Sequence, residues 1–282
     1  MRLRGISRKP PMYEELARDI RDKRVVLFAG AGLSVPLGLP SWKELMSYMA
    51  KDLEYDPDVL IRPGADYLQI AEFYKLEKDS IGPLRSWMDR SWQVDDDTLA
   101  ASRLHNQIVD LDFPLIYTTN YDRNIERIFE LRSKPFTKIR SVLDVATAPL
   151  GRTQIIKFHG DFDDDTSLVL TESDYFERLQ FESPLDVKFR ADVLGRSILF
   201  VGYSLSDLNL RLLLYRLQKT WAITGFAAKR PQSYIVLLRP DPVQESVLTS
   251  RGIRPIVSEA LDPKDALPEF FGKLLEAIGP KG

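Results

Sequence analysis

Four apolar runs of the chain end in short segments of glycine and polar residues. These segments are Gly30 to Ser34, Thr118 to Asp122, His159 to Asp161 and Gly202 to Asp207. Ligands of open α/β sheets bind at the carboxyl ends of the strands. If the four runs are neighbouring strands of one parallel sheet, we expect the four segments to converge on one crevice.

His159 and Asn120 are the residues best suited to acid–base chemistry. His159 ends an apolar run and precedes Gly160, so its imidazole can project from the sheet edge. A neutral histidine accepts a proton near pH 7, and an asparagine can orient a water molecule or a hydroxyl group. Asp122 follows Asn120 at the same strand end. The other histidine, His105, lies in a helical pattern and is expected to pack in the core or at the surface.

The glycine turn that begins at Gly30 is suited to an anion. Gly30 and Gly32 allow a tight turn and a close approach of backbone N–H groups, which is how strand-to-helix turns bind phosphates. The signal is weak alone, because a glycine turn that only admits close packing has the same pattern. The ordinary dinucleotide fingerprint would need a third glycine where Val35 stands, so a conventional dehydrogenase is disfavoured.

The composition excludes several kinds of chemistry. The chain has no cysteine and two histidines, which excludes disulfides, thiolate catalysis and a zinc ribbon. The aspartates at 95–97 and 161–165 lack the ligand spacing of a calcium loop, and no metal is expected. With 39 basic and 41 acidic residues the net charge is −2, so direct binding of nucleic acid is not expected either.

The hydropathy pattern contains no candidate for a membrane span or a secretory signal. No stretch approaches about 18 consecutive apolar residues. The first eleven residues are basic and lack the apolar run of a signal peptide. We therefore expect a soluble, cytoplasmic protein without a membrane partner.

Six short β-branched or aromatic runs predict buried strands. They lie at 25–30, 114–119, 154–160, 197–203, 233–238 and 254–258. Helical patterns alternate with them, which predicts a three-layer, Rossmann-like α/β fold with a parallel sheet of about six strands. The length of 282 residues is close to the upper limit for one hydrophobic core, so we expect a single domain over 1–282.

One region, at about 41–111, breaks the alternation and predicts a helical insertion. Ser41 and Glu44 have the spacing of a capping box, and apolar residues at helical spacing follow them. Further candidate helices cover 66–78, 82–92 and 98–110. We expect these helices to pack over one end of the sheet with the help of three tryptophans, Trp42, Trp87 and Trp92.

The four segments together resemble the sirtuin-like domains of bacterial anti-phage defence proteins. Their motifs are GAGLS at 30–34, TTNYD at 118–122, FHGD at 158–161 and GYSLSD at 202–207. The resemblance implies an NAD-binding domain, with Asn120 and His159 as the catalytic pair. The residues it implies for binding NAD are Gly30, Ala31, Gly32, Ser34, Thr118, Asp122, Gly202, Tyr203, Ser204 and Asp207.

Two departures from the deacylating sirtuins bear on the reaction. Those enzymes carry a four-cysteine zinc ribbon after the His-Gly motif and a proline, aspartate, phenylalanine, arginine loop after the first turn. Here the ribbon is missing and the sequence at 38–42 is GLPSW. Because the ribbon helps to form the acyl-lysine groove, water becomes the expected nucleophile. Loss of the cationic nicotinamide leaving group needs positioning and a base more than a strong acid.

The resemblance therefore implies an NAD+ hydrolase that releases nicotinamide, gives ADP-ribose and depletes NAD in anti-phage defence by abortive infection. A lysine deacylase and a sensor that binds NAD or ADP-ribose without turnover are the alternatives. NAD would be the substrate, with no metal. Unregulated activity would be toxic, so we expect a latent state. The resemblance implies a homo-oligomer or a partner such as a HerA-like ATPase, an Argonaute-type protein or a phage component as the switch.

Overall fold

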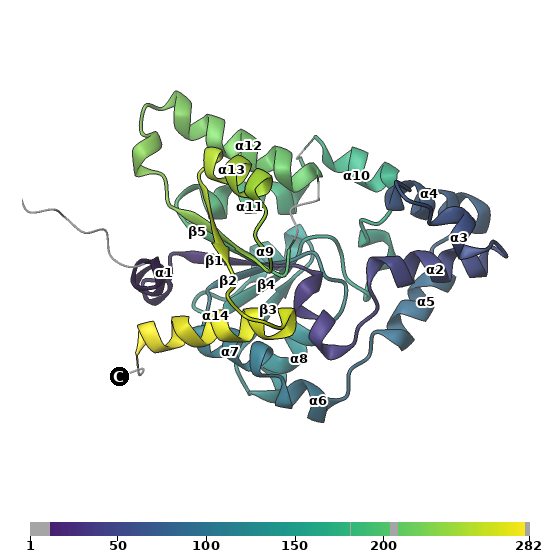
Figure 1. Cartoon of the computed structure of the whole chain (residues 1–282), viewed down its shortest axis with the longest axis horizontal. Coiled ribbons are helices and arrows are strands. Elements are labelled where there is room, and N and C mark those ends of the chain that lie inside the picture. The colour runs from purple at the N-terminus through teal and green to yellow at the C-terminus, as the bar shows by residue number, and fades with distance from the viewer. Residues whose placement is uncertain (1–11, 181, 204–207, 280–282) are drawn as a thin grey trace, which may run out of the picture.

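The centre of the molecule is a parallel sheet of seven strands in the order β3-β4-β2-β1-β5-β6-β7 (Figure 1). The computed structural model describes residues 12–180, 182–203 and 208–279. The strands are β1 (Val25–Ala29), β2 (Leu115–Thr118), β3 (Phe136–Ile139), β4 (Thr153–Lys157), β5 (Ser197–Val201), β6 (Ser233–Leu237) and β7 (Ile253–Val257).

Helices cover both faces of this sheet, which gives three layers (Figure 1). One face is covered by α1 (Met12–Arg21), α7 (Arg103–Leu111), α8 (Asn124–Leu131) and α14 (Pro263–Ile278). The other is covered by α9 (Val142–Thr147), α11 (Pro184–Leu194), α12 (Leu208–Ile223) and α13 (Pro242–Ser250). Successive residues of a strand alternate between the faces, so Leu27 packs in the first core and Phe28 in the second. The predicted three-layer parallel α/β fold is confirmed.

The strand β3 has no counterpart among the six predicted strands. It lies at one edge of the sheet beside β4, and Ile139 is its one buried residue. A half-exposed edge strand contains polar residues such as Thr137 and Lys138 and lacks the continuous apolar run of a central parallel strand. The sequence criterion therefore missed it.

The region predicted as a helical insertion holds six helices and no strand. Beside α7 these are α2 (Trp42–Asp52), α3 (Pro57–Leu60), α4 (Tyr67–Lys78), α5 (Gly82–Ser91) and α6 (Asp96–Ala101). The helices α2, α4 and α5 share a separate core with residues of the segments that follow β2 and β4, among them Tyr121 and Phe162. Trp42, Trp87 and Trp92 pack against this core. We call residues 41–92 the helical unit; it lies beyond one end of the sheet (Figure 1). In contrast, α7 packs on the sheet.

The start of the helical unit is fixed by the predicted capping box. Ser41 accepts a hydrogen bond from the Glu44 backbone N–H, and the Glu44 carboxylate accepts one from the Ser41 backbone N–H. The box satisfies two N–H groups at the start of α2 that the helix itself leaves without partners. None of the helices in the described ranges is long and apolar enough to cross a lipid bilayer.

Candidate active site

A cavity of about 440 Å³ lies between the carboxyl ends of the central strands and the helical unit. β4, β2, β1 and β5 are consecutive in the sheet, so the segments that follow them meet at one edge. The residues of these segments that line the cavity include Ala31, Ser34, Asn120, Asp122, His159, Gly202 and Tyr203. The volume is typical of a site for a small molecule or cofactor.

Asn120 is held at this edge by three hydrogen bonds. Its side-chain Nδ2 donates to the Gly30 carbonyl and to Ser34 Oγ, both at 3.2 Å, and its backbone N–H donates to Thr118 Oγ1 at 3.0 Å. Asn120 is 7% exposed. The side chain is therefore fixed between the β1 and β2 segments, with its amide donors turned towards the first segment.

Asp122 is joined to Asn120 through Ser34. Ser34 Oγ donates to Asp122 Oδ2 at 2.7 Å, and the Asn124 backbone N–H donates to Asp122 Oδ1 at 3.0 Å. The second bond lies at the first residue of α8, where a carboxylate is favoured by the backbone N–H groups of the helix start. Asn120, Ser34 and Asp122 thus form one buried polar chain along the cavity wall.

His159 reaches the same cavity from β4. Gly160, with φ +96°, turns the chain directly after it, and a Cβ at this glycine would lie 2.3 Å from the Ser167 carbonyl oxygen. The His159 ring meets the Tyr175 ring edge-on at 5.5 Å, and Tyr175 belongs to α10 (Glu172–Arg178). The structure therefore brings the two predicted catalytic side chains to one cavity from two strands.

The glycines of the turn after β1 allow this turn to pack closely against the segment after β5. The N–H groups of Gly30 and Gly32 donate to the carbonyls of Val201 and Gly202, at 3.0 and 2.8 Å. A Cβ on Gly32 would lie 2.6 Å from Gly202 Cα. These two N–H groups are thus engaged by backbone rather than directed at the cavity, and the two glycines do not line it.

Gly32→Ala is expected to lower the free energy of unfolding by about 1–3 kcal/mol, because the new methyl group would meet backbone, which cannot rotate away. Gly195→Ala is the control: no atom lies within 4 Å of its Cβ position, and its φ of −115° suits alanine. Urea denaturation of both variants measures the difference. Equal stabilities would contradict the packing role of Gly32.

The remaining predicted site residues fall into two groups. Gly30, Gly32 and Thr118 lie behind the cavity wall and hold Asn120 and Gly202 in place. Ser204 and Asp207 lie outside the described residues. In the described ranges, no group of three or more histidines, aspartates or glutamates could hold a metal ion.

The opposite wall of the cavity is apolar and comes from the helical unit, which the sequence did not assign to the site. It consists mainly of Trp42, Leu45, Tyr67, Leu68 and Trp92. Tyr175 of α10 was missed as well. Aromatic and aliphatic residues at helical spacing look the same whether they fill a core or face a cavity, so no sequence signal could have singled these out.

His105 does not line the cavity; it is fully buried in α7, with Nδ1 2.9 Å from Ser102 Oγ. Burial lowers its pKa to about 4 from an ordinary value of 6.5, and the Asp122 carboxylate opposes this only in part. Because the folded pKa is depressed, the unfolded chain binds more protons between pH 6.5 and 4. The stability supplied by neutral His105 is present above pH 6.5 and is lost as the pH falls through that window.

The free energy of unfolding is therefore expected to fall, through His105, by on the order of 3 kcal/mol between pH 6.5 and pH 4. His105→Gln removes the titrating group and should flatten this part of the profile. Denaturation at a series of pH values measures both proteins. Parallel profiles would show that His105 does not titrate with a depressed pKa.

A family model described as a SIR2-like domain matches residues 114–256, just over half of the chain. The chain belongs to the SIR2-like domain family. The resemblance drawn from the four motifs is thereby confirmed. The matched range of this SIR2-like domain contains Asn120, Asp122 and His159, whereas the turn that begins at Gly30 precedes it.

The curated relatives that this SIR2-like domain matches are named as NAD(+) hydrolases or as a defence-associated sirtuin. The protein named NAD(+) hydrolase ThsA from Enterococcus faecium is 31% identical over 73% of this chain and 42% of the relative. The protein of the same name from Bacillus cereus (strain MSX-D12) is 27% identical over 74% of this chain and 43% of the relative. Defense-associated sirtuin 2 of Bacillus subtilis is 27% identical over 88% of this chain and 24% of the relative. The chain spans less than half the length of each of them.

Proposed function

We propose that this SIR2-like domain hydrolyses NAD+ to nicotinamide and ADP-ribose and acts as an NAD-depleting effector in anti-phage defence. The observation that carries the proposal is the meeting of Asn120, Asp122 and His159 at one cavity with an apolar opposite wall. The names of the relatives support the same reaction. A histidine can accept the proton of the attacking water, and an amide can orient that water or a ribose hydroxyl group.

In the proposed reaction, the bond between the anomeric carbon of the ribose and the nicotinamide nitrogen breaks, and its electron pair neutralises the pyridinium. Water adds to the same carbon, and its proton passes to the His159 imidazole. Asn120 orients the water or a ribose hydroxyl group, and Asp122 lies at the nicotinamide end. The apolar wall limits other water, which strengthens electrostatic stabilisation of the cationic sugar.

Product analysis tests the proposal. The purified chain, alone and mixed with proteins encoded beside it, is incubated with NAD+, and nicotinamide and ADP-ribose are quantified. Equal amounts of both products are expected. NAD consumption that needs an acyl-lysine peptide would indicate a deacylase instead. Binding of NAD with no nicotinamide release under any of these conditions would indicate a sensor.

Regulation and location extend this proposal. We propose a latent, homo-oligomeric protein that is released by a partner such as a HerA-like ATPase or an Argonaute-type protein, with the whole chain as one NAD-binding domain in the cytoplasm. The support is physical: continuous NAD hydrolysis would deplete the cell that makes the enzyme. The mass of the purified protein, measured before and after mixing with candidate partners, tests this part.

A further inference from the structure

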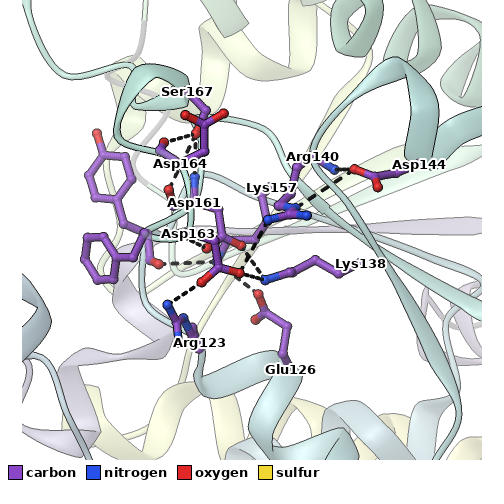
Figure 2. Close-up of polar contacts among 12 residues, drawn as sticks. Arg123, Glu126, Lys138, Arg140, Asp144, Lys157, Asp161, Asp163, Asp164 and Ser167 are labelled. Carbon is purple, nitrogen blue, oxygen red and sulfur yellow. Dashed lines mark hydrogen bonds and ion pairs between the residues drawn. The ribbon is translucent and has the colours of Figure 1, made fainter.

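A cluster of charged side chains lies against the polar segments of the cavity (Figure 2). Two of its members, Lys157 and Asp161, stand two residues before and two residues after His159. Both are fully buried. A buried charge is unfavourable unless the charged group is paired and hydrogen-bonded, so both residues need partners within the protein.

Lys157 joins β4 to the segment that follows β2. Its Nζ donates to the Asp122 carbonyl at 2.6 Å and lies 3.5 Å from the Tyr121 carbonyl. These carbonyls belong to the turn that carries Asn120 and the Asp122 carboxylate. One ammonium group therefore fixes that turn relative to the strand that leads into His159.

Glu126 supplies the counter-charge from α8. Its Oε1 lies 3.3 Å from Lys157 Nζ, and the residue is buried. Burial raises the pKa of Glu126, and the charge of Lys157 opposes that rise. Among the described residues its carboxylate oxygens accept no hydrogen bond. Glu126 thus balances the charge of Lys157, whereas the directional contacts of the ammonium group are with the carbonyls.

A second group of ion pairs fixes the chain after His159. Lys138 of β3 lies 3.0 Å from Asp161 Oδ2 and 2.5 Å from Asp163 Oδ2. Burial lowers the pKa of Lys138, but its hydrogen bonds with these two carboxylates outweigh burial and raise it. Asp163 also pairs with Arg123, the residue after Asp122. The segments on both sides of His159 are therefore tied to the turn after β2 or to its neighbours.

We propose that Lys157 is a positioning residue for the hydrolysis proposed above, on which this inference rests: its ammonium group holds the turn of Asn120 and Asp122 at a fixed distance from His159. Lys157 does not line the cavity, so it acts through the turn. A buried ion pair can often be replaced by apolar residues without loss of stability. Replacing both Lys157 and Glu126 by apolar residues therefore removes the carbonyl contacts of Lys157 without leaving an unpaired charge.

The test compares Lys157→Met with the double variant Lys157→Met/Glu126→Leu in the full chain, under the conditions in which the wild type releases nicotinamide. The single variant leaves Glu126 without its counter-charge and is expected to be less stable. The double variant should regain a melting temperature close to the wild type. Its kcat should still be lower by about tenfold or more, because Asn120 and Asp122 are no longer held at a fixed distance from His159.

Lys188→Met is the matched control. Lys188 forms a partly buried ion pair with Asp192 within α11, at 2.7 Å, away from the cavity. This variant should keep the wild-type kcat. A double variant of Lys157 and Glu126 that is stable and has the wild-type kcat would overturn the positioning role and leave the proposed hydrolysis intact.

A second measurement does not depend on turnover. In a His159→Ala background, titration calorimetry compares the affinities for NAD+ and for ADP-ribose, which lacks nicotinamide. A displaced Asn120–Asp122 turn should change the ratio of the two affinities by about threefold or more in Lys157→Met/Glu126→Leu, and Lys188→Met should leave the ratio unchanged. An unchanged ratio in the double variant would overturn the proposal, even if the wild type released no nicotinamide and the proposed function had failed.

Discussion

His159→Ala is expected to lower the rate of nicotinamide release by about 100-fold or more. A general base contributes about 10²- to 10⁴-fold to such a step, and no other histidine lines the cavity. The alanine variant also loses the ring contact with Tyr175, so its melting temperature is measured with its rate. The expected pattern is a folded protein that binds NAD+ and turns it over slowly or not at all.

Two further variants make this result specific. His159→Gln keeps a polar side chain without a group that titrates near neutrality, and it should be as inactive as the alanine variant. His105→Gln alters the other histidine, which does not line the cavity, and should keep activity near pH 7.5. Undiminished release by both variants at position 159 would reject the assignment of the base.

Asn120→Ala is expected to reduce nicotinamide release by about 100-fold or more, because in the proposed reaction the amide orients the attacking group. The same amide links Ser34 to the Gly30 carbonyl. Truncation leaves Ser34 Oγ without its donor in a buried site, whereas the Gly30 carbonyl keeps the Leu33 backbone N–H at 3.0 Å. The free energy of unfolding should fall by about 1–3 kcal/mol. Rate assays and urea denaturation of the same preparation measure the two effects.

Asn106→Ala provides the control for lost hydrogen bonds. Asn106 Nδ2 donates to the carbonyls of Ala100 and Ser102, at 2.8 and 2.9 Å, and its Oδ1 accepts from Arg132 at 2.7 Å. This variant therefore also loses two bonds donated by an amide, together with the bond from Arg132, and Asn106 does not line the cavity. It should lose stability and keep its kcat. If Asn120→Ala lost no more activity than Asn106→Ala, Asn120 would have only a structural role.

The sequence was most informative about the central strands and the segments that end them. Buried parallel strands such as Val25–Ala29 are continuous apolar runs, and the polar residues after them stand out by contrast. The edge strand at Phe136–Ile139 lacks that contrast and was missed. The capping box at Ser41 was predictable because both of its members lie within four residues of each other.

Contacts between distant segments were not predictable in the same way. Lys157 lies within a run that was correctly predicted as a strand, but its partners at 121–126 are more than thirty positions away. The packing of Gly32 against Gly202 likewise depends on β1 and β5 being neighbours, which the order of strands along the chain does not reveal. Such partners follow from the topology of the sheet.

The cavity is built from two parts of the chain with separate hydrophobic cores. The polar side chains stand at the sheet edge, whereas the facing surface, with Trp42, Leu45 and Tyr67, belongs to the helical unit. Tyr121, which lies between Asn120 and Asp122, packs in the core of that unit. Substitutions that alter this core are therefore expected to reach the Asn120–Ser34–Asp122 chain through Tyr121 as well as to reshape the cavity. The shape of the space for a ligand and the placement of the polar groups are therefore coupled, and a redesign of one has to preserve the packing of Tyr121.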